Sequence, residues 1–168
     1  MKRILAIAIL TLMVFHFSSC EKDDICVEGD TPLLVLGFFD QEDPENEKNV
    51  PSLRILAFEP ITTISSFNDR TNVDSIGVPL RIDTNATSFL LITNSADDED
   101  GMETGNIDTL TFNYEVNEEF ISRACGFIAN YNAIDTIRQV SSENWIQKIE
   151  IIQPDVTRSN AIHVKIFH

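Results

Sequence analysis

The chain has 168 residues, of which 27 are acidic and 12 basic, giving a formal net charge of −15. So acidic a protein is repelled by nucleic acid and by anionic lipid head groups, and its Lys and Arg residues are scattered singly. Nucleic-acid binding is therefore excluded. The cysteines and histidines show no CxxC motif and no metal-ligand spacing, so the sequence predicts no metal and no cofactor.

The N-terminus has the pattern of a bacterial lipoprotein signal. Two basic residues precede an apolar run over residues 4–17, and Ser18 and Ser19 then lead into Cys20. The run is shorter than the ~20 residues that span a bilayer. We expect residues 1–19 to be removed and Cys20 to be acylated, which attaches the protein to a membrane. An uncleaved anchor and an ordinary secretory signal are the alternatives.

Residues 20–31 are interpreted as a lipidated, acidic tether. Lys22, Asp23 and Asp24 resemble the signal that sends lipoproteins of Bacteroidota-type bacteria to the outer face of the outer membrane. This predicts a cell-surface location, with the periplasmic face as the alternative and a plain solvated linker as the simpler interpretation. Lys2 and Arg3 leave with the signal, so ten basic residues face 27 acids and the mature charge is −17.

Two cysteines remain once Cys20 carries the lipid. An even pair in an exported chain most often forms a disulfide, so we expect Cys26 to bond to Cys125. Two free thiols are the alternative. The bond would close a loop of about 100 residues, worth at most ~4–5 kcal/mol in the chain-entropy model.

The remainder, residues 32–168, is predicted to be a single all-β domain. Residues 33–39 form a continuous apolar run, and residues 109–116 alternate strictly between apolar and polar side chains. Residues 162–166 alternate as well, which places His163 on a solvent-facing side. Seven or eight short strands separated by acidic turns favour an antiparallel β-sandwich of immunoglobulin-like type, and a small β-barrel is the alternative.

One hairpin can be assigned from the pattern. Residues 107–116 and 120–129 are expected to pair across a turn at residues 117–119, with Val116 opposite Phe120. The same pairing leaves the apolar side chains of one face in need of a cover, which the segment around Cys26 is expected to provide. These side chains are Ile121, Cys125 and Phe127.

Most of the mature chain resembles a family of Bacteroidota lipoproteins known only as a domain of unknown function. The resemblance rests on residues 18–26, on Thr31-Pro32-Leu33, on residues 108–114 and on the terminal residues 163–166, and its most distinctive piece is the Arg-Ala-Cys-Gly segment at residues 123–126. It implies a small exported β domain. It implies no known activity and supplies no catalytic residues.

The sequence contains few candidates for a catalytic or metal-binding site. His16 leaves with the signal, and no nucleophile-elbow pattern accompanies His163 or the terminal His168. No catalytic residue is therefore predicted. The acidic run at residues 97–103 lacks the EF-hand spacing and is interpreted as a solvated loop rather than a calcium site.

Three tripeptides resemble the Asp-Ser/Thr-aliphatic acceptor for O-glycosylation in these bacteria. They would be modified at Ser75, Thr109 and Thr136. The simpler interpretation is that a turn-forming Asp precedes the start of a strand.

Two classes of function fit these observations. The first is a non-catalytic binding or accessory module at the cell envelope, which binds a protein or a glycan through its loops and edges. The alternative is a carboxylate-dependent hydrolase of envelope or extracellular glycans, since many acidic side chains are available. A pocket with two carboxyls of raised pKa would favour the enzyme, and an exposed apolar patch would favour binding.

Overall fold

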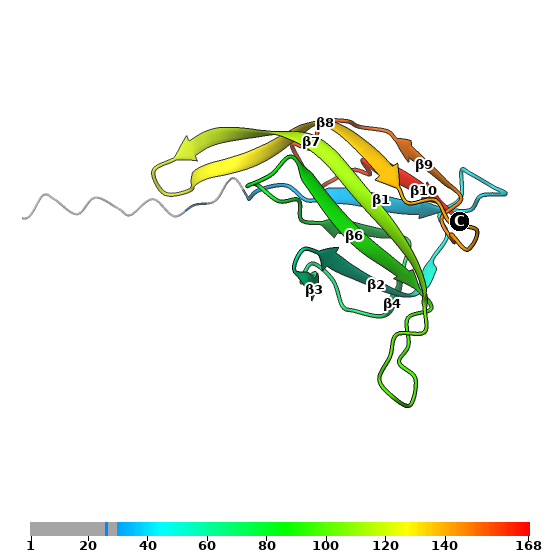
Figure 1. Cartoon of the computed structure of the whole chain (residues 1–168). Coiled ribbons are helices and arrows are strands. Elements are labelled where there is room, and N and C mark those ends of the chain that lie inside the picture. Colours follow the sequence, from blue (N-terminus) through cyan, green and yellow to red (C-terminus); the bar gives the residue numbers. More distant parts are fainter. Residues whose placement is uncertain (1–25, 27–29) are drawn as a thin grey trace, which may run out of the picture.

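A computed structural model describes residue 26 and residues 30–168, which form ten strands (Figure 1). The first five are β1 (Leu34–Phe39), β2 (Val50–Phe58), β3 (Ile61–Thr63), β4 (Thr71–Val73) and β5 (Ser75–Val78). The others are β6 (Ala86–Thr93), β7 (Asn106–Ser122), β8 (Gly126–Arg138), β9 (Lys148–Ile151) and β10 (Val164–Phe167). No helix among these residues is long and apolar enough to span a membrane.

The strands form two sheets that share one apolar core. The larger sheet has the order β3-β2-β6-β7-β8, with β4 also paired to β2, and the smaller has the order β5-β1-β10-β9. Alternating side chains of β7 point into the core, as period-two patterning requires. They meet side chains of β1, the strand that is buried on both faces. The core residues of these two strands are Leu110, Phe112 and Tyr114 of β7, with Leu34, Leu36 and Phe38 of β1.

The prediction of an all-β fold with mostly antiparallel strands is confirmed, but the strand number and the topology are not. The sheets are not closed into a barrel, and the described chain has more strands than expected. The immunoglobulin-like topology is also not confirmed, because β1 and β10 pair in parallel at the centre of the smaller sheet. Both ends of the domain therefore meet in one sheet, which no local sequence pattern indicates.

The hairpin prediction is wrong in its turn and its register. β7 continues through residues 117–119, and Phe120 pairs with Phe127 rather than with Val116. The chain reverses at residues 123–125, and Gly126, the next residue, adopts a positive φ of 73° that favours glycine. Residues 117–119 are all polar because this part of β7 is exposed on both faces, so polarity alone misplaced the turn.

The solvent-facing assignment of His163 is also wrong. Its side chain is 2% exposed, and its Nδ1 accepts a hydrogen bond from the Val35 N–H at 3.1 Å. Its own backbone N–H donates to the Val35 carbonyl at 2.9 Å. The ring thus supplies an acceptor to β1 just before β10 begins, and this extends the parallel pairing. A polar residue in an alternating run can be buried when it satisfies a backbone group in this way.

Candidate ligand-binding pocket

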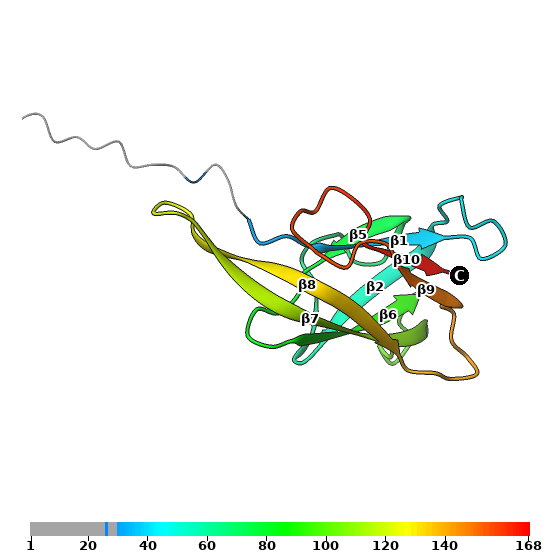
Figure 2. The same ribbon diagram turned by 90° about the horizontal axis from the view of Figure 1, so that it is seen from above.

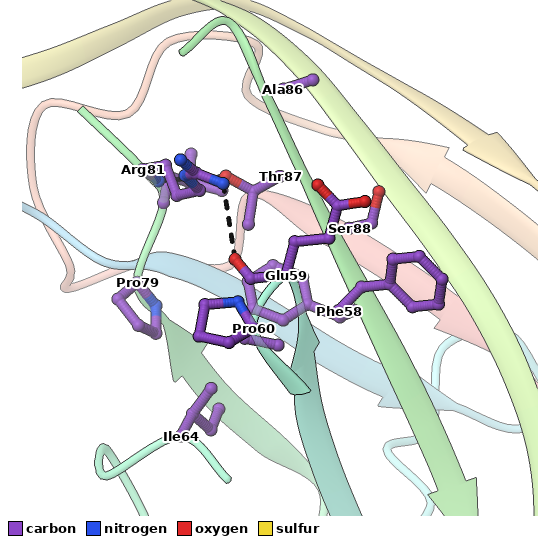
Figure 3. A pocket seen from close by; sticks show the side chains of 12 residues that line it. Phe58, Glu59, Pro60, Ile64, Pro79, Arg81, Ala86, Thr87 and Ser88 are labelled. Carbon is purple, nitrogen blue, oxygen red and sulfur yellow. Dashed lines mark hydrogen bonds between the residues drawn. The ribbon is translucent and has the colours of Figure 1, made fainter. Parts of the chain in front are cut away.

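A pocket of about 570 Å³ opens where the end of β2 turns away from β6 (Figure 3). It lies between the β2–β3 turn, the segment after β5 and the first residues of β6. This volume falls within the ~300–1,000 Å³ that small-molecule sites occupy. The lining residues include Ala57, Phe58, Glu59, Pro60, Ile64, Pro79, Leu80, Arg81, Thr87 and Phe89.

The pocket has apolar walls that reach the surface. Leu80 and Phe89 are buried core residues, while Phe58 at the opening is 42% exposed. Ile61 and Ile82, which follow lining residues in the chain, are 65% and 60% exposed. Exposed apolar side chains gathered beside a concave site are typical of a binding surface rather than of a folding core.

Arg81 is the cationic group of the pocket. Its Nε and Nη2 donate to the Asp83 carboxylate at 3.0 and 2.8 Å, and its Nη1 donates to the Glu59 carbonyl at 3.4 Å, a contact drawn in Figure 3. A guanidinium has five N–H groups, so these bonds leave two for a ligand. The hydrogen bond and charge of Asp83 raise the pKa of Arg81, and Arg81 in turn lowers the pKa of Asp83. Both groups are therefore charged at neutral pH.

Two tyrosines hold the wall that carries Arg81. The Tyr114 hydroxyl donates to the Arg81 carbonyl at 2.8 Å, and the Tyr131 hydroxyl donates to the Leu80 carbonyl at 2.9 Å. The Arg81 N–H donates to Thr87 Oγ1 at 3.0 Å. Burial raises the pKa of Tyr131 to about 12 and also raises that of Tyr114. Both phenols therefore stay protonated, and the pocket wall is fixed before any ligand arrives.

The disulfide pair predicted from the sequence lies outside this pocket. Cys26 and Cys125 are joined, with Cα atoms 4.9 Å apart, which is normal for a disulfide. The bond ties the N-terminal segment to the turn between β7 and β8. The predicted lipidation residue Cys20 and the export residues Lys22, Asp23 and Asp24 lie outside the described residues.

The three predicted glycosylation residues differ in access. Ser75 is exposed at the start of β5, and its hydroxyl donates to Asp74 at 3.1 Å. Thr109 is half-buried in β7, and the hydroxyl oxygen of Thr136 is buried. Ser75 is thus the accessible acceptor of the three, and its modification stays a prediction.

The acidic run at residues 97–103 is organised by protein contacts. Asp97 pairs with Arg70, and Asp98 Oδ1 accepts hydrogen bonds from the backbone N–H groups of residues 100 and 102. Burial raises the pKa of Glu103, but bonds from the Gly105 N–H, Ser95 and the Ala96 N–H outweigh it, so the net shift is downward. In the part of the chain that the structure describes, no group of three or more His, Cys, Asp or Glu could hold a metal ion.

The shifted carboxyl pKa values bear on the hydrolase alternative. A glycosidase needs one carboxyl whose pKa is raised, so that it stays protonated as a general acid. The carboxyl shifts that the structure gives run in the opposite direction, at Asp40, Asp83, Asp97 and Glu103. Asp83, the one beside the pocket, is held ionised by Arg81 and therefore suits ion pairing.

Comparison with protein families gives one match. A family model covers residues 52–168, well over half of the chain. The chain belongs to DUF6452, a family of unknown function. The DUF6452 match begins within β2 and includes every residue that lines the pocket, whereas β1 and Cys26 precede it. Membership of a family without assigned function was expected, while the lipoprotein and its bacterial group stay predictions. No curated protein and no solved structure matches the chain.

This DUF6452 pocket could not be predicted from the sequence. Its walls come from three segments that are separated along the chain, and each is an ordinary turn or strand end. Pro60 and Pro79 mark two of these turns, since proline commonly bounds strands. Nothing in the local pattern shows that the two turns meet.

Proposed function

We propose that this protein is a lipid-anchored outer-membrane protein that binds an apolar ligand without transforming it. In this proposal the lipid on Cys20 attaches it to the membrane, and Lys22, Asp23 and Asp24 direct it to the cell surface, with the periplasmic face as the alternative. The apolar run ending in Ser-Ser-Cys and the acidic residues after it support this location.

The pocket is the observation that carries the binding proposal. Its walls are apolar, and Arg81 offers two N–H groups at one side. These features suit a ligand with an apolar body and an oxygen that accepts hydrogen bonds, such as a carboxylate or a carbonyl. The wall is fixed by Tyr114 and Tyr131, so little conformational entropy is lost on binding.

Fluorescence titration with anilinonaphthalene sulfonate tests the pocket, since this probe combines an apolar ring system with an anionic acceptor. Arg81→Met keeps an unbranched side chain but removes the donors, so we expect the affinity to fall by about tenfold or more, as for a lost charged hydrogen bond. Asp83→Asn removes the competing carboxylate from Arg81 and is expected to tighten binding.

Val140→Ser provides the matched control, because Val140 is an exposed apolar residue beyond the end of β8, outside the pocket. This change is expected to leave the affinity unaltered. A probe affinity that responds to Val140→Ser but to neither pocket variant would show that the probe binds elsewhere and would remove the proposal.

The anchor is tested separately in cells. Radiolabelled palmitate is expected to label the protein and to be lost in Cys20→Ser, which should release the protein from the membrane fraction. Protease treatment of intact cells then distinguishes the two faces. A protein that is degraded only after lysis lies on the periplasmic face.

A further inference from the structure

The far half of the β7–β8 hairpin forms a two-stranded arm. β6 pairs with β7 only as far as Asn113, so residues 115–122 of β7 pair with β8 alone, over residues 126–132. Figures 1 and 2 show this arm projecting beyond the other strands, at the end of the molecule opposite the C-terminus. The turn at its tip contains Cys125, which is bonded to Cys26.

An aromatic pair occupies the end of the arm. Phe120 and Phe127 lie directly opposite each other, with ring centroids 5.2 Å apart in an edge-to-face arrangement. The two side chains are 56% and 67% exposed. Phe127 is among the most exposed large apolar residues of the described chain. The segment around Cys26, which was expected to cover this face, lies outside the described residues except for Cys26 itself. Two neighbouring exposed phenylalanines indicate a contact surface.

The short chain between Cys20 and Cys26 limits how far the aromatic pair can lie from the membrane. Six residue steps separate Cys20 from Cys26, and a fully extended chain covers at most ~3.3–3.6 Å per residue. Cys26 is therefore within about 20 Å of the lipid-bearing residue. Because the disulfide joins Cys26 to the arm turn, the arm tip is the part of the domain that is held nearest the membrane.

We propose that Phe120 and Phe127 insert into the membrane to which the Cys20 lipid attaches the protein, as a second membrane contact. This inference rests on the proposed lipid anchor. Phenylalanine has no polar group, and it is among the apolar side chains that membrane-surface segments bury at the boundary between head groups and acyl chains. The acidic Glu118 and Glu119 beside the pair give no attraction to anionic lipids, so the contact is apolar and suits a neutral lipid surface.

Loss of membrane binding is a poor test, since a lipid anchor holds the protein on the membrane by itself. Depth of insertion is the informative measurement. The lipidated mature protein carrying Phe127→Trp is reconstituted into neutral phosphatidylcholine vesicles with brominated acyl chains, which quench tryptophan on contact. Trp145, the native tryptophan, follows β8 at the other end of the hairpin and serves as an internal reference.

We expect Phe127→Trp to add a tryptophan signal that shifts to shorter wavelength and is quenched by the brominated lipid. Wild-type protein, with Trp145 alone, should not be quenched, nor should the matched control Val140→Trp at the exposed far end of the hairpin. Val140 is 84% exposed, so this substitution is readily accommodated.

Each other outcome overturns the inference in a recognisable way. If the protein floats with the vesicles but the tryptophan added by Phe127→Trp is not quenched, the anchor stands and the arm contact is wrong. A wavelength shift without quenching indicates burial against protein, such as a second copy of the chain. Equal quenching in the Phe127→Trp and Val140→Trp variants means that the whole domain lies on the membrane. A protein that does not float with vesicles refutes the anchor and, with it, this inference.

Discussion

Several buried polar side chains in this fold act as substitutes for backbone hydrogen-bond partners. His163 accepts from the Val35 N–H, and Tyr131 donates to the Leu80 carbonyl. The Asp108 carboxylate is 1% exposed and accepts from the Ile146 N–H at 2.8 Å, which holds the segment before β9 against β7. These residues lie where strands end or loops cross, because those are the places where sheet pairing leaves backbone groups unsatisfied.

His163 gives a prediction at this scale. His163→Ala leaves the Val35 N–H without its acceptor, so we expect the free energy of unfolding to fall by about 1–3 kcal/mol. His163→Asn keeps an acceptor at nearly the position of Nδ1 and should cost less. Urea unfolding at pH 7.5 measures both, and equal losses for the two variants would show that packing of the ring, rather than the hydrogen bond, matters.

The same residue predicts a pH dependence. Burial lowers the pKa of His163, an effect that a hydrogen bond with the Arg158 backbone partly offsets. As the pH falls below the ordinary value of 6.5, the unfolded chain therefore binds the proton before the folded protein does. The contribution of His163 to the free energy of unfolding is therefore fully present above pH 6.5 and is lost as the pH falls below it. The decline should be shallower in His163→Asn. His168, whose pKa burial also lowers, remains in both proteins and leaves a residual slope.

At the scale of elements, the sequence predicts strands better than it predicts their partners. The apolar run at residues 33–39 corresponds to β1, because a strand buried on both faces needs consecutive apolar residues. The alternation at residues 109–116 corresponds to β7, because a strand buried on one face needs an apolar residue only at every second position. The hairpin turn was misplaced because exposed strand residues and turn residues are equally polar. Gly126, which follows the true turn, can be seen in the sequence. It does not identify the turn, because a single glycine fits a β-bulge as well as a turn.

The arm is the element whose stability depends most on covalent support. A two-stranded ribbon is marginal on its own, and beyond Asn113 β7 pairs with β8 alone. Thr31 Oγ1 accepts a hydrogen bond from the Ala129 N–H at 3.2 Å, and Tyr131 pairs with Val156, so the base of the arm is tied to the domain. The Cys26–Cys125 bond does the same at its tip.

Removing that bond is therefore expected to destabilise the protein. Cys26→Ser, Cys125→Ser and the double variant should each lower the free energy of unfolding by roughly 3–5 kcal/mol, as for other disulfides that close long loops. The three losses should be equal, because each variant removes the same bond. Alkylation of both cysteines in the native protein without reductant would contradict this prediction.

At the scale of the whole molecule, the fold is closed by its two ends. β1 and β10 pair in parallel and form the centre of the smaller sheet, with β5 on one side and β9 on the other. The last residue adds to this closure, since the His168 carbonyl accepts from the Lys48 ammonium at 2.8 Å. The pairing joins segments at opposite ends of the chain, so it depends on the complete fold rather than on any local sequence signal.

This closure predicts that the part matched by the family model is too short to fold alone. A fragment of residues 52–168 lacks β1, whose Leu34, Leu36 and Phe38 are fully buried, and it leaves β5 without a partner strand and β10 paired with β9 alone. We expect a fragment of residues 26–168 to unfold cooperatively in thermal melts followed by circular dichroism, and the shorter fragment to show no cooperative transition. Leu36→Ala in the longer fragment calibrates the comparison, because one truncated core leucine should cost about 2–5 kcal/mol while preserving the transition. A cooperative melt of residues 52–168 would instead show that the larger sheet is stable without β1, and that β1 is an addition to an independent core.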